Sequence, residues 1–200
     1  MSHHTAQLLE ELTRKTENFL QKAVSEWQML PGEVLSTPPA PGAWSAAQCI
    51  EHLNIYGRYY LPAMEKAIQR AKQSGSRAAG RFRPGWLGAY FTRLMQPLAD
   101  GQVKTRMKAP LNAVPSAQPD ARAMVAEFID QQEMLLKLLG AAASVNLDDV
   151  RIPISIAPWI RLKLGDTFLF LTAHIQRHMT QAERAIREAN RADRQLLSTH

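Results

Sequence analysis

The sequence predicts an all-α protein: an up-down four-helix bundle with a long crossover between its second and third helices. Apolar residues recur at the three- and four-residue spacing of one helical face in four stretches, at about 5–30, 45–73, 119–139 and 166–189. Proline and glycine interrupt the chain between these stretches, above all across 74–118. Because each predicted helix has a single apolar stripe, the four helices must bury those stripes against one another.

The composition is that of one globular domain, with a core expected over about residues 5–190 of the 200. A hydrophobic content of 46% argues against disorder. The single cysteine, Cys49, excludes an internal disulfide and a CxxC site. No apolar run approaches the length of a membrane span, and residues 1–4 lack a basic and apolar leader. We therefore expect a cytoplasmic protein that has no membrane partner.

The first helix is predicted over about 5–30, since Leu12, Phe19 and other apolar residues repeat at helical spacing. Pro31-Gly32 is expected to end it, because proline and glycine are common just past a helix end. Three prolines and a glycine then predict a loop across 36–43.

The second helix is predicted to begin at a capping box. Ser45 is a favoured N-cap residue and Gln48 falls three positions later, while Trp44 precedes the cap. The apolar pattern continues to about residue 73. Pro62 falls inside this pattern and is expected to kink the helix or to leave one carbonyl unpaired.

The crossover at 74–118 is predicted to be irregular, with a short helix over Trp86–Met95 that exposes Arg93. Between Arg70 and Lys108 there are nine basic residues and one acid, so this segment carries +8 and the remainder of the chain nets −2. Loops this long are usually functional or mobile, and we expect this one to lie across the mouth of the bundle.

The third helix is predicted to begin near Pro119, a favoured first-turn residue, and to close at Gly140. An irregular connection is expected over 144–165, with 152–156 as a short extended piece. The fourth helix then follows from residue 166.

Two histidines stand four apart in the predicted fourth helix, His174 and His178. They are separated by about 40° on a helical wheel and by one turn, so both imidazoles can reach one metal ion. On the wheel His178 falls inside the apolar stripe and His174 on its flank, while Arg177 lies on the far, polar side. The alternative is that each histidine makes its own buried hydrogen bond. Position 175 is Ile rather than Glu, which excludes an HExxH zincin site.

Several of these features together resemble the DinB-like family, also called the YfiT-like metalloenzymes. Trp44-Ser45 opens the second helix, His52 follows seven residues after Ser45, and the HxxxH pair of His174 and His178 lies in the last helix. The resemblance covers nearly the whole chain. It implies that His52, His174 and His178 bind one divalent metal, nickel or zinc.

The resemblance also implies a range of activities. Some members of the family are thiol S-transferases or thiol-dependent isomerases that use a small thiol as co-substrate. The long basic crossover departs from a compact member, which leaves the substrate of this chain open. Independently of the family, three neutral imidazoles leave a divalent ion with open positions for water or substrate.

Four further residues are candidates for the surroundings of such a site. Gln181 lies one turn past His178, where it could orient an imidazole or a bound water; the alternative is a polar residue at the helix edge. Tyr56, Tyr59 and Tyr60 are candidates to line a pocket, although aromatic residues at this spacing are more often part of a core.

The leading functional hypothesis is a metal-dependent enzyme, of thiol S-transferase or hydrolase type, that acts on a small anionic molecule. No catalytic residue can be assigned from the sequence. One alternative is a metal-binding bundle without turnover. Another is nucleic-acid binding through 70–108, where Phe82, Trp86, Tyr90 and Phe91 interleave with basic residues as stacking platforms do. No nucleic-acid-binding motif accompanies them, so this is the least favoured hypothesis. The same aromatic residues suggest a homodimer contact.

Overall fold

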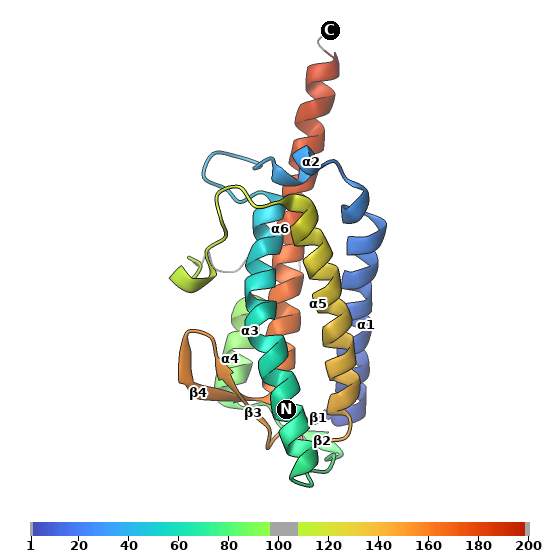
Figure 1. The fold of residues 1–200 in the computed structure, drawn as a ribbon, viewed down its shortest axis with the longest axis vertical. Helices are drawn as coiled ribbons and strands as arrows, with labels where there is room; N and C mark the ends of the chain where they lie inside the picture. The colour runs from blue at the N-terminus through green and yellow to red at the C-terminus, as the bar shows by residue number, and fades with distance from the viewer. Residues whose placement is uncertain (1, 97–107, 199–200) are drawn as a thin grey trace.

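A computed structural model describes residues 2–96 and 108–198 of the chain, with side chains as far as Arg191 (Figure 1). The described chain is mostly helical, which confirms the predicted helical class, and it also contains two small two-stranded sheets. The elements in chain order are β1 (His3–His4), α1 (Thr5–Ser25), η1 (Trp27–Met29), α2 (Gly32–Ser36), α3 (Ala46–Gln73), β2 (Arg81–Phe82), α4 (Trp86–Met95), η2 (Leu111–Ala113), α5 (Ala121–Ala142), β3 (Arg151–Ile154), β4 (Ala157–Lys163) and α6 (Leu164–Ser198).

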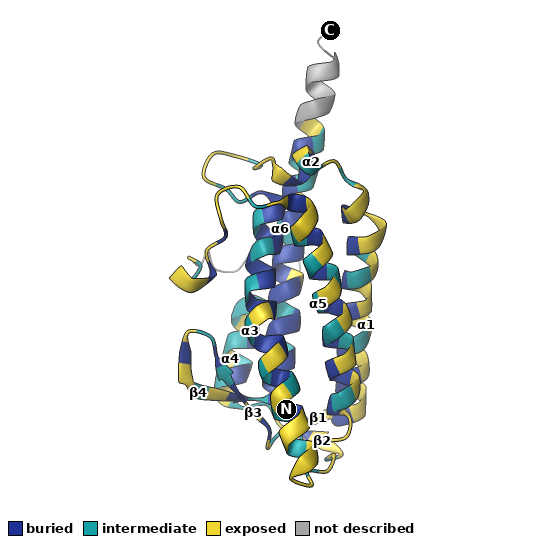
Figure 2. Ribbon diagram, in the orientation of Figure 1, coloured by how far each residue is buried: buried dark blue, intermediate teal, exposed yellow. Residues whose placement is uncertain are grey.

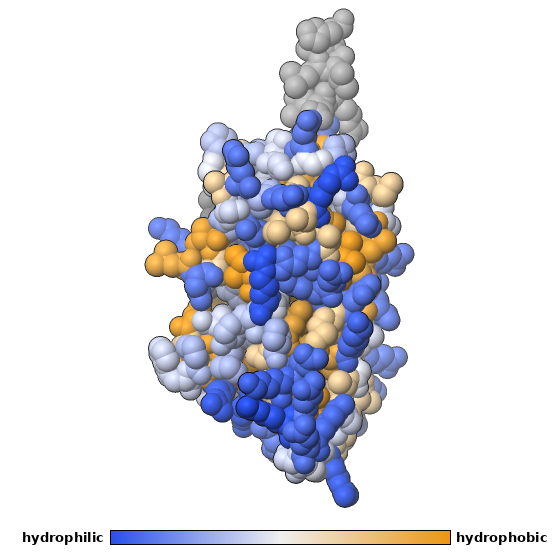
Figure 3. Space-filling model, viewed as in Figure 1, coloured by the Kyte–Doolittle hydropathy of each residue, from blue (hydrophilic) through white to orange (hydrophobic). Residues whose placement is uncertain are grey.

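The long helices α1, α3, α5 and α6 lie side by side (Figure 1). Helix α3 packs against α5 and α6, and α1 packs against the same two helices. Their buried residues face one another across the centre of the molecule, and exposed residues cover the outside (Figure 2). Hydrophilic side chains cover much of the face seen in Figure 3, with hydrophobic residues in separate groups among them.

Helices α3 and α5 run parallel, so the strict up-down alternation predicted from the sequence is wrong. Gln48, near the start of α3, donates hydrogen bonds to the carbonyls of Ser116 and Ala117 just before α5. Further along the same two helices, Arg58 pairs with Glu127. The chain returns between residues 74 and 120 to the end of the molecule where α3 began, which is why the next helix repeats its direction (Figure 1).

The first helix ends at Ser25, earlier than predicted, and a 3₁₀ turn follows. Trp27 of that turn is buried, with its ring 5.7 Å from the ring of Phe128 on α5. Seating this indole in the core takes the chain off the path of α1. Pro31 and Gly32 do not simply end a helix, because the short helix α2 starts at Gly32.

The capping box predicted for α3 is present. The Ser45 Oγ accepts from the Gln48 N–H at 3.2 Å, and the Ser45 N–H donates to the Gln48 Oε1 at 3.0 Å. The helix continues through Pro62 to Gln73, as the apolar pattern predicted. This cap fixes the start of α3, two turns before His52.

The crossover is irregular and contains the predicted short helix, α4, on which Arg93 is exposed. Residues 97–107, which include Lys104 and Arg106, lie outside the described part of the chain. Helix α4 packs against α6. Its start is held by the buried carboxylate of Asp166, which accepts from the Gly85 N–H at 3.0 and 3.2 Å.

The connection before the last helix was predicted as irregular, but it forms a hairpin of β3 and β4. Ile154 and Leu162 of the hairpin turn inward and, with Ala157, form a small second apolar cluster packed by Leu87 and Phe91. Strand residues that bury alternate side chains need a covering layer, and α4 provides it. The order of the elements along the chain did not predict that α4 would cover this hairpin, because the two are distant in sequence.

Two helix ends also differ from the prediction. Helix α5 runs through Gly140 to Ala142, and α6 begins at Leu164 and extends to Ser198 rather than ending near residue 189. Gly140 is exposed, with open space around the position of its missing Cβ, so nothing forces the helix to end there. Among the described residues, no helix is both long enough and apolar enough to cross a bilayer.

Alanine at two helical glycines should have opposite effects on stability. A Cβ at Gly88 would lie 2.4 Å from the Cβ of Asp166, so Gly88→Ala should force α4 away from α6 and cost about 1–3 kcal/mol. At Gly140 the added methyl meets nothing within 4 Å, so Gly140→Ala should stabilise by about 1 kcal/mol through helix propensity alone. Urea denaturation of both variants measures the difference, and equal effects would contradict the close packing of α4 on α6.

Candidate metal centre

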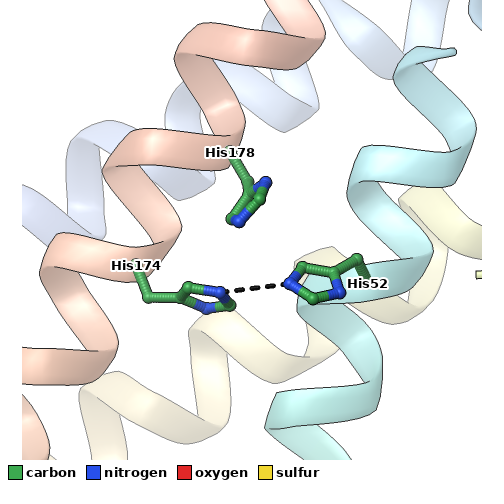
Figure 4. Close-up of side chains that lie close together, drawn as sticks. All are labelled: His52, His174 and His178. Carbon is green, nitrogen blue, oxygen red and sulfur yellow. Dashed lines mark hydrogen bonds between the residues drawn. The ribbon is translucent and has the colours of Figure 1, made fainter. Parts of the chain in front are cut away.

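Three buried histidines from two helices meet inside the molecule (Figure 4). His52 comes from α3, and His174 and His178 come from successive turns of α6. One ring nitrogen from each lies within 4.8 Å of the corresponding nitrogens of the other two. Their exposed fractions are 3%, 2% and 9%, respectively. The cluster could therefore hold one metal ion.

A backbone carbonyl fixes the protonation of the His52 ring. The Nδ1 of His52 lies 2.6 Å from the carbonyl oxygen of Ala113, an atom that can only accept. Nδ1 therefore carries the hydrogen and donates it, which leaves a lone pair on Nε2. That Nε2 points toward the Nε2 of His174, 3.2 Å away (Figure 4).

A side chain does the same for His178. Its Nδ1 lies 3.0 Å from the Oε1 of Gln181, one turn further along α6. With the amide oxygen as acceptor, Nδ1 carries the hydrogen and Nε2 holds the lone pair. Hydrogen bonds of this kind on the outer nitrogen are usual for histidines that bind metal, since they set both the tautomer and the ring orientation.

His174 supplies the strongest physical argument for a cation at this place. Its Nδ1 is buried and has no hydrogen-bond partner in the described part of the chain. With its hydrogen on Nε2, His174 donates to the His52 Nε2 at 3.2 Å and leaves its buried Nδ1 lone pair without a donor among the described residues. With its hydrogen on Nδ1, that N–H has no acceptor among them, and its Nε2 lone pair faces that of His52, so that the two lone pairs repel. A cation among the three Nε2 atoms turns this repulsion into attraction, so the donor set fits a divalent metal.

Burial keeps all three imidazoles uncharged. Loss of solvent lowers the pKa of His178 to about 3, with the nearby His52 and Arg177 acting in the same direction. The pKa of His174 is also held well below its usual value, mainly by burial, and that of His52 is lowered for the same reason. Neutral imidazole is the form that binds metal.

The relative depth of the two α6 histidines is the reverse of the prediction. The helical wheel placed His178 deeper, whereas His174 is the more buried of the pair. The rings of Tyr56 and Phe170 lie 4.3 and 5.7 Å from the His174 ring and enclose it. His178 is one turn closer to Trp44, which is only half-buried, with ring centroids 6.2 Å apart.

The histidines open onto a cavity of about 920 Å³. One part of its wall is apolar and aromatic, formed by Tyr56, Tyr60, Phe91, Ile154, Leu162 and Phe170. Another part is basic, formed by Lys108, Arg177, Arg184 and Arg187. No Asp or Glu belongs to the described residues that line it. The cavity thus joins a metal-binding donor set to a positive, partly apolar chamber.

Two of the three candidate tyrosines line the cavity, Tyr56 and Tyr60, and Tyr59 is not among its described lining residues. The Tyr59 hydroxyl instead lies 3.4 Å from the carbonyl oxygen of Ile154. Burial raises the pKa of Tyr56 to about 12, so this phenol stays protonated at neutral pH and can donate a hydrogen bond. The Tyr60 hydroxyl accepts from the Ser155 N–H.

The basic crossover contributes less to the site than its charge suggested. Of its described cations, Lys108 alone lines the cavity. The proposed row of stacking rings is also incomplete, because Phe82 is buried in the core and Phe91 packs against Phe170, 6.2 Å away. Trp86 remains 81% exposed. These positions give no support to nucleic-acid binding.

Sequence reasoning missed the arginines of α6 that line the cavity. Arg177 had been assigned to the polar far side of the helix, but it is buried and donates to the carbonyl of Leu94 at 3.0 Å. Helix α4 covers that side of α6, which a wheel of one helix cannot show. The regular spacing of Arg177, Gln181 and Arg184 was the available indication that they share one face.

Comparison with protein families identifies a family for this chain. A model of the DinB superfamily matches residues 6–182, a range that includes all three histidines. The chain belongs to the DinB superfamily. This confirms the resemblance noted in the sequence. Comparisons of this DinB-superfamily chain with curated proteins and with solved structures find no match.

The metal-free protein should lose stability as the pH falls below about 6.5. A histidine whose pKa is lowered by folding takes up its proton first in the unfolded chain. The contribution of such a histidine to the free energy of unfolding is complete above its pKa in the unfolded chain, about 6.5, and is lost as the pH falls from there to its pKa in the folded protein. Each such histidine should lower the free energy of unfolding by up to about 1.4 kcal/mol per pH unit, measured by urea denaturation between about pH 7 and pH 4.5.

The variant His174→Leu measures how much of this pH dependence of the free energy of unfolding comes from His174. It removes the ring that takes up the proton and puts an apolar side chain of similar size in its place. His4→Gln is the matched control, since His4 is exposed near the N-terminus. An unchanged slope in His174→Leu would mean that the ring is not held uncharged in the folded protein.

Proposed function

We propose that this DinB-superfamily chain is a metal-binding, metal-dependent enzyme of thiol S-transferase or hydrolase type that acts on a small anionic molecule. His52, His174 and His178 hold one divalent ion, nickel or zinc, with at least one position open. The observation that carries the proposal is the convergence of three buried ring nitrogens at the wall of a basic cavity.

The nature of the donors favours these metals. Imidazole nitrogen suits nickel and zinc, whereas calcium and magnesium prefer oxygen ligands. When bound, such an ion supplies Lewis-acid chemistry, lowering the pKa of a water or thiol that takes its open position. The chain contributes the rest: the Ala113 carbonyl and Gln181 orient two of the rings, and burial keeps all three neutral.

An incomplete ligand set favours catalysis over metal storage or structural support. In the described part of the chain, no fourth histidine, cysteine or carboxylate belongs to the cluster. Structural sites usually have four protein ligands, whereas catalytic sites keep a position for water or substrate. A bundle that binds metal without turnover remains the alternative, and it would bind the ion without accelerating any reaction.

The charge around the cavity favours an anionic substrate. Lys108 and Arg184 line it and form no ion pair within the described residues, so neither cation is already paired with a carboxylate there. A cleft with one sign of charge and low-dielectric walls attracts ligands of the opposite sign. A small anionic thiol as co-substrate matches these walls, with its thiol toward the histidines and its charged groups toward the arginines. The protonated Tyr56 can donate a hydrogen bond to either substrate.

A homodimer is part of the proposal. Trp86 and Tyr90 are exposed on α4, and exposed aromatic side chains are common in subunit contacts. Phe82, which was also expected to contribute, is buried and cannot. Light scattering at high protein concentration should give twice the 22.4 kDa chain mass; a monomer alone would contradict the dimer.

Purified protein should contain about one nickel or zinc ion per chain, because the three converging imidazoles form a single site for one divalent ion. Each of His52→Ala, His174→Ala and His178→Ala should abolish or strongly reduce this metal content in elemental analysis. His4→Ala, which removes a histidine outside the cluster, should keep it. Unchanged metal in the three cluster variants would contradict the site and the enzyme assignment built on it.

Removing a cavity cation should weaken anion binding selectively. For Arg184→Ala and Lys108→Ala we expect a loss of roughly 3–10-fold in affinity for an aryl carboxylate, and little change for its neutral amide, as a partly exposed charge contributes about 1 kcal/mol. Calorimetric titration measures both ligands. Lys66→Ala is the control, because Lys66 is an exposed cation on α3 away from the cavity lining. Equal losses for acid and amide would contradict charge recognition.

A further inference from the structure

Glu51 and His52 follow Gln48 by three and four residues in the first two turns of α3, so both lie beside Gln48 on one face of the helix. All three bind the same short segment, residues 113–117, which we call the strap. His52 binds its first residue, through the carbonyl of Ala113. The other two bind its end.

Glu51 holds the strap with one carboxylate oxygen. Its Oε2 accepts from the Ser116 N–H at 2.7 Å and from the Ser116 hydroxyl at 2.9 Å. Gln48 adds to this, as its Nε2 donates to the carbonyls of Ser116 and Ala117 at 3.0 and 3.3 Å. Ser116 is thus fixed to α3 through its N–H, its hydroxyl and its carbonyl, three residues after the carbonyl that contacts His52.

We infer that Glu51 is a positioning residue for the metal centre: by holding Ser116, it keeps the Ala113 carbonyl on the Nδ1 of His52. This rests on the proposed metal site. The carbonyl contact is what places the hydrogen on Nδ1 and the lone pair on Nε2. If the strap moves, His52 gains access to its other tautomer, which has a hydrogen on Nε2 and cannot bind a metal through that atom.

The strap is also continuous with the cavity wall. Ala109 and Pro110 precede it and line the cavity, and the Ala113 N–H donates to the Pro110 carbonyl at 2.8 Å. Between these residues and the strap, the Asn112 side chain donates to the carbonyl of Ser155 at the tip of the β3–β4 hairpin. Glu51 therefore acts on one end of a segment whose preceding residues line the cavity.

Two substitutions at position 51 separate positioning from a general effect on folding. Glu51→Ala removes the acceptor. Glu51→Gln keeps one oxygen in the same place, and because both bonds from Ser116 go to the single Oε2, that oxygen can accept both. Glu127→Ala is the matched control. Glu127, on α5, links that helix to α3 through Arg58 and also accepts from Gln131 of its own helix, but it does not contact the strap.

The first measurement is the tautomer of His52 in the metal-free protein, from long-range proton–nitrogen NMR of the imidazoles. Wild type, Glu51→Gln and Glu127→Ala should show the hydrogen on Nδ1 of His52. Glu51→Ala should show a mixture at His52 alone, with His178 unchanged because Gln181 still holds it. A single Nδ1–H tautomer in Glu51→Ala would overturn the inference.

The second measurement is zinc affinity, by competition with a chelator. Glu51→Ala should bind about 10–100-fold more weakly, the usual effect of losing a group that orients a ligand, while Glu51→Gln and Glu127→Ala stay near wild type. An equal loss in Glu127→Ala would show a general effect of loosening α3 and α5, and would overturn the role given to Glu51. If wild type binds no zinc or nickel, the proposed function fails, whereas the NMR result still tests how Glu51 positions His52.

Discussion

The burial of three uncharged imidazoles between α3 and α6 is the constraint on which the rest of the structure depends. A buried ring nitrogen without a hydrogen-bond partner costs free energy, so each histidine needs a partner for its Nδ1. The Ala113 carbonyl is that partner for His52, and Gln181 is that partner for His178. The Nδ1 of His174 has no partner among the described protein atoms. Either tautomer of His174 leaves its buried Nδ1 without a partner among these atoms, and in the Nδ1–H tautomer the Nε2 lone pairs of His174 and His52 face each other at 3.2 Å, an arrangement that a bound cation would stabilise.

The path of the crossover is tied to the hydrogen bond that it makes with His52. The carbonyl that contacts His52 belongs to the crossover, so the crossover must return along the molecule to the start of α3. That return makes α5 parallel to α3. It also takes α4 onto α6, where Asp166 holds its start and Phe91 joins the ring cluster around Phe170. The segment that departs most from a compact bundle thus contributes one part of the cavity wall.

The positive charge at the cavity comes from a different part of the chain than the sequence suggested. The sequence placed a strong positive field in the crossover, but the cations at the cavity come mostly from α6, with Lys108 as the crossover's described contribution. A wheel of α6 alone shows one apolar face and one polar face. Because α4 covers part of the polar face, Arg177 becomes buried and lines the cavity instead of facing solvent.

The sequence by itself determined the helical class, the start of α3, the DinB-like resemblance and the identity of the three histidines as candidate ligands. The capping box and the HxxxH pair depend on local spacing, because the first needs residues three apart and the second needs two side chains on successive turns. His52 was added to the pair by the family resemblance. The tertiary structure alone decided which atoms meet. Local periodicity could not show that α3 and α5 are parallel, that a hairpin precedes α6, or that Trp27 leaves the path of α1. Nor could it show that Glu51 and Ala113, distant in sequence, act on one imidazole, because such contacts depend on how the crossover returns to α3.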